Sequence, residues 1–524
     1  MGNSNLTNSP NVILFADITG VEWFSRGYGA YRLASEIREH GYSAVTVDFS
    51  TFLTWETFTQ LIDKTVGPDT LVVGFSSTWF PFRHQVDGYP NPRYTIGEHS
   101  KSLDASGDLS EYNGMAYKIS QGQLEKYVEY IKQANPKVKV ILGGAKAYEY
   151  MHEPCLDNVF IGYSENQLVD YLNSISKKSP RRLFSKIINY DPKAQIGKFD
   201  FNNSITTYVD TDCIHPEELG TIEFSRGCIF NCSFCSYPHR NQDTRNYVKY
   251  QEVIRKELLD NYHRWGLHKY VITDDTFNDY TEKLILINEV IQTLPFKPKF
   301  WAYIRQDIVA RNPEQAQLIK DIGIKEIYYG LDTWHDETAK RIKKGGSLAK
   351  KIEGMRICKE CWGDEVFVMA GIVVGLPLDT VKSIDDSIQW YQTEGYKYVD
   401  TLIYTSLTLK DFGDANQYQL ASDIEKDLKG YNYTFPNVEQ DPFGWVRHDS
   451  GDIITKEQAD SIMADSLAAV QPYWNKQLPW ESRLPGLTEM FVDSKTTDKK
   501  EMIHNYAITE YFPKLLSILQ NKTW

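Results

Sequence analysis

The chain has 524 residues, of which 41% are hydrophobic and 24% charged, and its formal net charge at pH 7 is -13. This length predicts about three domains, and the acidic charge argues against a nucleic-acid partner, because a broad nucleic-acid surface needs clustered lysine and arginine. No run of about 18 apolar residues and no charged-then-apolar leader occurs, so we expect a cytoplasmic protein without a membrane span. Seven cysteines, three of them in one tight run, predict a reducing compartment and no disulfide framework.

Residues 1–176 alternate strand-like and helix-like segments. Apolar strands are predicted at 11–16, 43–48, 70–75, 138–142 and 158–161, and helices at 31–40, 121–133 and 165–172. Nearly continuous apolar strands that alternate with helices are typical of a parallel sheet covered on both faces. We therefore expect an α/β, Rossmann-like first domain.

Small polar residues follow several of these strands. Ligands of a parallel sheet bind at the carboxyl ends of its strands, where glycine and serine let the backbone come close. The candidate contacts at this edge are Thr19, Gly20, Ser76, Ser77, Gly143, Gly144 and Gly162. A polar insertion over 81–114 is either a lid at the same edge or a disordered loop.

After a linker over 177–218, six strand-helix units are predicted within 219–408. The strands are expected at 221–224, 270–273, 300–304, 326–329, 367–374 and 399–404, with helices at 251–265, 281–292, 313–321, 348–361 and 381–392. Six parallel units predict an open partial (β/α)6 barrel, and by analogy with full barrels its chemistry belongs at the carboxyl ends of the strands.

Residues 409–524 form a mostly α-helical C-terminal region with no recognisable motif. Helices are predicted at 456–470 and 501–519. The region begins directly after the last barrel strand, so we expect it to close the open side of the barrel and to shape a substrate pocket.

A short cysteine run at the start of the barrel carries the strongest signal. Cys228, Cys232 and Cys235 are spaced C-x3-C-x2-C, and three thiolates can bind three irons of one [4Fe-4S] cluster while the fourth iron stays open for chemistry. The alternative is a zinc site with His239 as a fourth ligand. Zinc leaves the strand-helix units around the run without explanation, and His239 is expected to be structural.

This run resembles the signature of the radical S-adenosylmethionine (SAM) superfamily, including the aromatic Phe234 before the last cysteine. The polar strand ends that follow, at 274–277, 305–307, 330–333 and 375–380, resemble those of the cobalamin-dependent branch and related enzymes. The resemblance implies a [4Fe-4S] cluster on the three cysteines and SAM bound by Phe234, Asp275, Arg305, Asp332, Gly375, Leu376 and Tyr404.

Within that set the resemblance also implies separate roles. Asp275 faces the methionine amino group, and Arg305 or Asp332 faces the carboxylate or the ribose. Gly375, Leu376 and the backbone near Phe234 and Tyr404 hold the adenine.

The first domain, placed before such a barrel, resembles the cobalamin-binding domain of the same branch. This implies cobalamin at the edge lined by the serine and glycine candidates. Many cobalamin domains carry Asp-x-His-x-x-Gly, whose histidine ligates cobalt, whereas this chain reads Asp17-Ile18-Thr19-Gly20. A bound cobalamin would then lack a lower histidine ligand. The alternative is a Rossmann-like domain that binds no corrin.

The resemblance implies reductive cleavage of SAM at the cluster, followed by cobalamin-dependent methyl transfer to an unactivated centre of a small molecule or peptide. An electron donor such as flavodoxin or ferredoxin would be a partner. The alternatives are a cobalamin-family enzyme that performs cyclisation, rearrangement or coupling, and a tRNA methylthiotransferase-like enzyme. A non-catalytic iron–sulfur protein is disfavoured by the open iron.

Four cysteines lie outside the run. Cys358 and Cys361 form a C-x-x-C near the end of a predicted helix, and Cys155 and Cys213 are distant in sequence. A second cluster draws three or four ligands from such a set, so these four are expected to be structural thiols.

Overall fold

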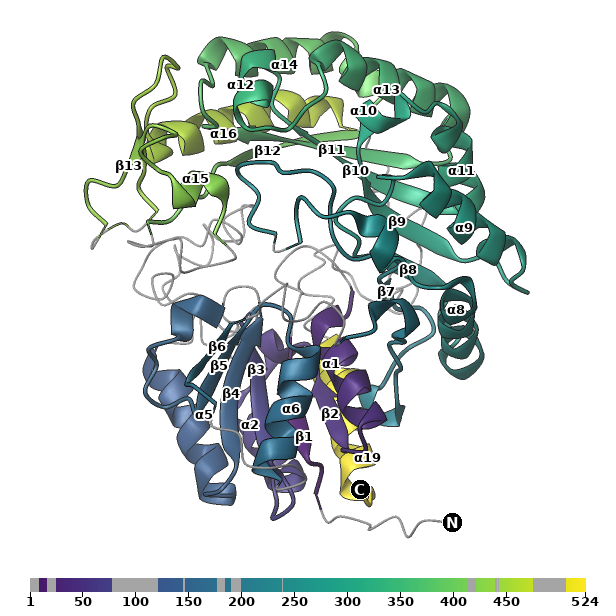
Figure 1. Ribbon diagram of the computed structural model, residues 1–524, viewed down its shortest axis with the longest axis vertical. Helices are drawn as coiled ribbons and strands as arrows, with labels where there is room; N and C mark the ends of the chain where they lie inside the picture. The colour runs from purple at the N-terminus through teal and green to yellow at the C-terminus, as the bar shows by residue number, and fades with distance from the viewer. Residues whose placement is uncertain are drawn as a thin grey trace.

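The structure is a computed structural model that describes residues 9–16, 25–77, 121–144, 147–176, 184–189, 199–237, 239–411, 421–438, 441, 443–474 and 506–524. It contains two six-stranded parallel sheets, one in each half of the molecule (Figure 1). The α/β class predicted from the sequence is confirmed. No helix within these ranges is both long and apolar enough to cross a membrane.

The first sheet has the order β2-β1-β3-β4-β5-β6, and every pair in it is parallel. Its strands are β1 (Val12–Phe15), β2 (Ala44–Val47), β3 (Val72–Ser76), β4 (Lys139–Gly144), β5 (Asn158–Ile161) and β6 (Ile187–Asn189). The sixth strand falls inside the predicted linker 177–218, so that prediction is corrected: the short apolar segment pairs with β5 and extends the sheet.

Helices cover both faces of this sheet because its strands are apolar on both sides. One face meets α1 (Tyr28–Glu39) and α6 (Glu165–Ile175), while the other meets α2 (Trp55–Thr65) and α5 (Gln121–Ala134). Along β1, Val12 and Leu14 belong to the first of these cores, and Ile13 and Phe15 to the second.

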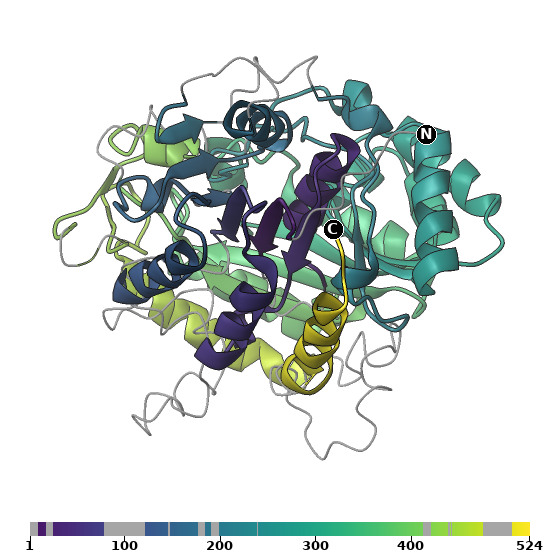
Figure 2. The same cartoon turned by 90° about the horizontal axis from the view of Figure 1, so that it is seen from below.

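The end of the chain returns to this first domain. Helix α19 (Phe512–Gln520) follows a π-helical turn (Ala507–Tyr511) and packs in the core that holds α2. Figure 2 shows it, in yellow, beside the purple N-terminal elements. The expected single C-terminal region 409–524 is therefore divided, because α19 is amphipathic and its apolar face completes the Rossmann-like core. Residues 421–474 stay with the barrel.

Leu515→Ala tests this docking. Leu515 is fully buried in the first domain's core, so its truncation should lower the free energy of unfolding of that domain by about 2–5 kcal/mol. Thermal or denaturant unfolding measures the change. Ser517→Ala, on the exposed side of the same helix, is the matched control, and equal stabilities of the two variants would contradict the docking.

The second sheet has the order β12-β11-β10-β9-β8-β7, again all parallel, as the open barrel requires. The strands are β7 (Gly220–Ile222), β8 (Lys269–Ile272), β9 (Lys299–Ile304), β10 (Ile324–Asp332), β11 (Phe367–Val374) and β12 (Thr401–Ser406). The main helices are α8 (Gln251–Trp265), α9 (Thr281–Gln292), α11 (Glu314–Ile322), α13 (Leu348–Trp362) and α14 (Val381–Thr393), with the short α10 (Gln306–Val309) and α12 (Asp336–Arg341) between them.

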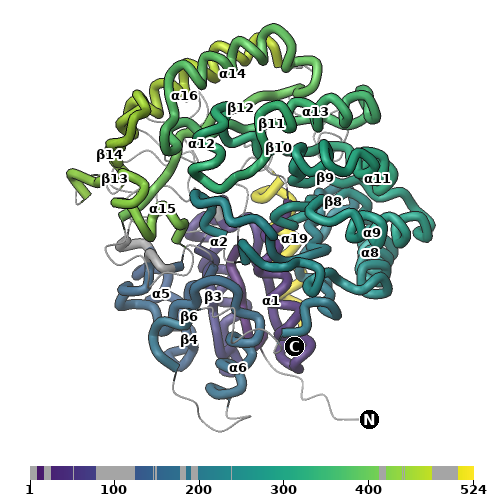
Figure 3. The backbone as a smooth tube through the Cα atoms, turned by 45° about the horizontal axis from the view of Figure 1, so that its top comes forward, coloured from purple at the N-terminus to yellow at the C-terminus, as the bar shows by residue number. Residues whose placement is uncertain are grey.

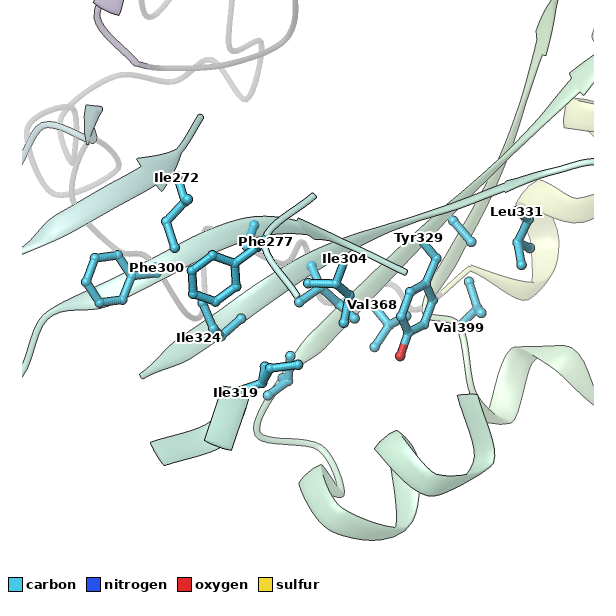
Figure 4. Packing of buried hydrophobic residues seen from close by; sticks show 14 of the residues in the cluster. Ile272, Phe277, Phe300, Ile304, Ile319, Ile324, Tyr329, Leu331, Val368 and Val399 are labelled. Carbon is cyan, nitrogen blue, oxygen red and sulfur yellow. The ribbon is translucent and has the colours of Figure 1, made fainter. Parts of the chain in front are cut away.

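The large core of the barrel lies between its strands and these helices, which line the outer side of the sheet (Figure 3). Phe300, Ile304, Tyr329 and Val368 are among the strand residues of this core, and they pack against helical residues such as Ile319 (Figure 4). Since side chains alternate along a strand, the other face of each strand is turned to the inside of the barrel.

The region 421–474 adjoins β11 and β12. It contains α15 (Asp423–Lys426), a two-stranded antiparallel pair of β13 (Tyr433–Thr434) and β14 (Val446–Arg447), and α16 (Lys456–Val470). Trp445 of this region is fully buried, and its indole N–H donates to the Leu407 carbonyl at 2.9 Å. The contact agrees with the expectation that the region closes the barrel beyond β12.

Candidate active site

The three cysteines lie on a loop after β7 that backbone hydrogen bonds hold in place. The Cys228 N–H donates to the His239 carbonyl at 3.0 Å, and the Gln242 N–H donates to the Cys228 carbonyl at 3.1 Å. None of the three cysteines takes part in a disulfide bond. The Cys235 sulfur accepts the Tyr237 N–H at 3.4 Å, a contact of the kind that tunes cluster sulfurs.

The thiols fit a cluster better than a single metal ion. Burial raises the pKa of Cys228, and it raises that of Cys235 to about 11, so metal binding must displace protons there. In the described part of the chain no three His, Cys, Asp or Glu side chains are placed to share one metal ion. A [4Fe-4S] cluster needs no such arrangement, because each thiolate binds a different iron.

His239 does not complete a zinc site. Its Nδ1 lies 3.1 Å from the Gln242 side-chain oxygen, and burial lowers its pKa to about 4. The structural role expected for this residue agrees with these contacts.

The C-terminal region holds the cysteine loop at Ser233, a contact that the sequence did not predict. The Ser233 N–H donates to the Ile342 carbonyl at 2.8 Å, and its own carbonyl accepts the Ile424 N–H at 3.0 Å. The Tyr431 hydroxyl donates to the Ser233 hydroxyl at 2.7 Å. Region 421–474 thus supports the cysteine loop as well as the edge of the barrel. No motif marks these residues, because the contact joins segments about 200 positions apart in the chain.

Asp275, after β8, is the least satisfied acid near the cysteines. Its Oδ2 is buried and has no hydrogen-bond partner among the described residues. Burial raises the pKa of this carboxyl well above its usual range. The Tyr237 hydroxyl opposes the shift, and the nearby charges of Glu223 and Asp274 add to it. A buried hydrogen-bond acceptor without a partner is rare, and it indicates a ligand that carries a hydrogen-bond donor. The methionine ammonium group of SAM is such a donor.

Arg305, at the end of β9, reaches the cysteine loop. Its guanidinium lies over the Phe230 ring, 3.7 Å from the centroid, and its Nη2 donates to the Lys344 carbonyl at 2.6 Å. The Asp307 carboxylate accepts from Arg305 Nε at 2.9 Å. Burial alone would lower the pKa of Arg305, but its pKa is raised overall by Asp307, Cys232 and Asp332 together, so the group stays charged. A fixed guanidinium suits a carboxylate or ribose.

Asp332 ends β10 in a strained conformation. Its φ is +58°, in the left-handed region that non-glycine residues avoid, at a register shift in the pairing with β11. The buried Lys351 amine donates to the carbonyls on either side, Leu331 at 2.8 Å and Thr333 at 3.0 Å. The Asp332 carboxylate pairs with Lys344. Strain held in this way is typical of functional sites.

For Gly375, Leu376 and Tyr404 the structure shows the protein contacts that hold them, and their contact with adenine stays a prediction. Gly375 and Leu376 are buried, and their carbonyls accept hydrogen bonds from Tyr433 and Arg447. The Tyr404 hydroxyl lies 2.8 Å from Ser387 on α14, on the outer side of the sheet. The chain folds back over β11 here, which the sequence pattern did not indicate.

The strand ends of the first sheet bring most of their candidates together. The Ser77 N–H donates to the Gly143 carbonyl at 2.7 Å, and the Gly162 N–H donates to the Gly144 carbonyl at 3.2 Å. Ser76 pairs with Gly143 in the register of β3 and β4. Gly144 has a φ of +116°, and a Cβ there would lie 2.7 Å from the Ser77 hydroxyl, so only glycine fits.

This edge offers the backbone groups of glycines and the hydroxyls of Ser76 and Ser77, which suit a large ligand that lies across it. Thr19 and Gly20 lie outside the described residues, as does the insertion 81–114.

The remaining cysteines lie away from the loop. Cys358 is buried in the barrel core, Cys213 is buried in the first domain, and Cys155 packs against that same core. The Cys361 thiol donates to Gln317 at 3.4 Å, between α13 and α11. These positions agree with the structural thiols expected from the sequence.

An open six-stranded barrel with three cysteines on the loop after its first strand defines a radical SAM core, and residues 222–391 match the family model described as the radical SAM superfamily. These residues form a radical SAM domain, which is about a third of the chain. Such a domain implies SAM and a [4Fe-4S] cluster.

Two curated relatives support this class. The uncharacterized methyltransferase PH0819 of Pyrococcus horikoshii is 23% identical over 315 residues, which are 56% of this chain and 67% of the relative. The putative methylthiotransferase MJ0865 of Methanocaldococcus jannaschii is 26% identical over 277 residues, 50% of this chain and 59% of the relative. The chain thus spans about two thirds or less of the length of these relatives.

Two solved structures share the fold. The radical SAM methyltransferase TsrM of Kitasatospora setae, solved with tryptophan and a SAM analogue, has a TM-score of 0.56 at 14% identity, covering 76% of this chain and 74% of TsrM. The cobalamin-dependent SAM radical enzyme OxsB, in its apo form, also has a TM-score of 0.56 at 14% identity, covering 98% of this chain and 72% of OxsB. At this identity the likeness is one of fold.

Proposed function

We propose that this protein reductively cleaves SAM at a [4Fe-4S] cluster and uses cobalamin to transfer a methyl group to an unactivated centre of a small molecule or peptide. Cys228, Cys232 and Cys235 would hold the cluster. When bound, the cluster and SAM supply one-electron cleavage of the sulfonium, and cobalamin supplies a transferable methyl group. The observation that carries the proposal is the buried, unpartnered Asp275 oxygen beside the cysteine loop.

Different residues around that oxygen would bind different groups of SAM. Asp275 would accept a hydrogen bond from the methionine ammonium through its Oδ2 atom, which is buried from solvent. Arg305, fixed by Asp307 and Phe230, would bind the methionine carboxylate. Asp332, held at its strained φ by Lys351, would accept from the ribose hydroxyls, and Phe234 would flank the adenine. Each role is one of orientation, since SAM carries the reacting bond.

Cobalamin would lie at the edge formed by Ser76, Ser77, Gly143, Gly144 and Gly162. This edge lies next to the cysteine loop, because Glu165 at the start of α6 pairs with Arg226 before Cys228 at 2.8 Å. A methyl donor on one domain and a substrate activated on the other need this proximity.

Anaerobic reconstitution tests the proposal. The purified chain should bind a [4Fe-4S] cluster, release 5'-deoxyadenosine or S-adenosylhomocysteine from SAM when reduced, and retain cobalamin through desalting, as judged by absorption. A chain that cleaves SAM and retains no corrin at saturating cobalamin would leave a plain radical enzyme. Comparing metabolites from cells with and without the protein would identify a substrate by the mass of one methyl group.

The second candidate is methylthio transfer, favoured by the name of one relative. That chemistry uses a second cluster bound by cysteines of the first domain, and the first 176 residues contain only Cys155. Iron and sulfide content after reconstitution separates the two candidates, because methyl transfer requires a single cluster.

A further inference from the structure

Two side chains join the domains next to the cysteine loop. Arg226 lies between β7 and Cys228, and its guanidinium is held by two carboxylates. Its Nε and Nη2 each donate to Glu223 at 2.9 Å, and its Nη1 donates to Glu165 of the first domain at 2.8 Å. The Arg226 side chain is 7% exposed, so the ion pair is shielded from solvent.

Tyr163 forms the second connection. It directly follows Gly162 at the carboxyl edge of the first sheet, and its ring lies under the Arg226 guanidinium, 4.2 Å from Cζ to the centroid. Its hydroxyl is hydrogen-bonded to the hydroxyl of Tyr237. The Tyr163 and His239 rings are 4.9 Å apart. Tyr163 therefore contacts Arg226, before the cysteine run, and Tyr237 and His239, after it.

Tyr237 continues the connection into the barrel. Its backbone N–H donates to the Cys235 sulfur at 3.4 Å, so the residue that meets Tyr163 also orients the last cysteine. Its hydroxyl lies beside Asp275 as well, where it stabilises the charged carboxylate against the larger effect of burial. A continuous path of contacts thus runs from the edge at Gly162, through two tyrosines, to Cys235 and Asp275.

The path matters because it joins segments from different parts of the fold. Gly162 follows β5 of the first sheet, Cys235 lies on the loop after β7, and Asp275 follows β8. Buried hydroxyls need partners, and removing one member of a pair leaves the other unsatisfied. The tyrosine pair therefore adds a link between the domains beside the ion pair of Arg226 and Glu165.

We propose that Tyr163 and Tyr237 are positioning residues, which hold Cys235 and Asp275 in register with the carboxyl edge of the first sheet. The inference rests on the proposed function, since it assigns a purpose to the pair in binding SAM. It predicts that a change at the edge of the first domain alters SAM binding in the barrel without any contact between the two sites.

The experiment compares Tyr163→Phe, Tyr237→Phe and the double variant in the anaerobically reconstituted full chain. Each replacement keeps the ring and removes one hydroxyl. Each single variant should weaken SAM binding about 3- to 10-fold and change the SAM-induced shift of the reduced cluster's electron paramagnetic resonance signal. The double variant should equal Tyr237→Phe, because that single variant already lacks the bond to Tyr163 as well as the contact of its hydroxyl with Asp275. Tyr171→Phe is the control, since this buried hydroxyl bonds Asn158 within the first domain at 2.7 Å.

A second measurement does not need the cluster. In the apo protein, hydrogen exchange of the amides at 234–237 should be faster in Tyr163→Phe than in the wild type and unchanged in Tyr171→Phe. Wild-type SAM affinity in both single variants, or unchanged exchange at 234–237, would overturn the inference. If the wild type binds no cluster but Tyr163→Phe still shows faster exchange, the link between the domains is supported and the proposed function is wrong.

Discussion

Cys232→Ala should abolish cluster binding and reduce SAM cleavage to the level of a protein-free blank. Cys232 is 8% exposed and central in the loop, and a cluster with two protein thiolates would have two uncoordinated corners. Ligands of this kind act as a unit, so the loss should be complete. Iron content, the charge-transfer absorption of the cluster and 5'-deoxyadenosine release measure it.

Cys361→Ala is the matched control. This thiol is partly buried between α13 and α11 and lies away from the loop, so its variant should keep the iron content and SAM cleavage of the wild type. If Cys232→Ala retained a full cluster and cleaved SAM, the radical SAM assignment of the loop would be wrong.

Asp275→Asn should weaken SAM binding about 10- to 150-fold, because a hydrogen bond between charged groups contributes about 1.5–3 kcal/mol. In the apo protein, by contrast, the same change should make the protein more stable at high pH than the wild type. The pKa of Asp275 is raised in the folded state, so the neutral acid is compatible with folding, and stability is lost as the pH rises through the raised pKa. Asparagine cannot ionise, so the variant should not show this loss.

Equilibrium binding of SAM and thermal unfolding over a pH series measure the two effects. Asp386→Asn is the control, since this acid is on the exposed side of α14 and pairs only with Lys382 in the described structure. A SAM affinity within a factor of about two of the wild type would show that Asp275 does not face the ammonium group.

The sequence by itself determined the α/β class and most strands of the two parallel sheets, though not β6. Apolar strands alternating with helices leave few arrangements, since parallel strands need helical crossovers and a common edge for their carboxyl ends. The predicted strand 367–374 and helix 251–265 match β11 and α8 residue for residue. The sequence also predicted a cluster site at Cys228, Cys232 and Cys235, because metal ligation imposes a local spacing that can be read without the fold.

Only the tertiary structure showed which segments, distant in the chain, pack onto the first domain and onto the barrel. The return of α19 to the first domain, the support of Ser233 by Tyr431 and the covering of Gly375 by Trp445 each join residues far apart in the chain. The pairing of Tyr163 with Tyr237 belongs to the same group. Periodicity records that a side chain is apolar or polar but not which partner it meets, because burial is non-directional and the partner is chosen by the packing of the whole chain.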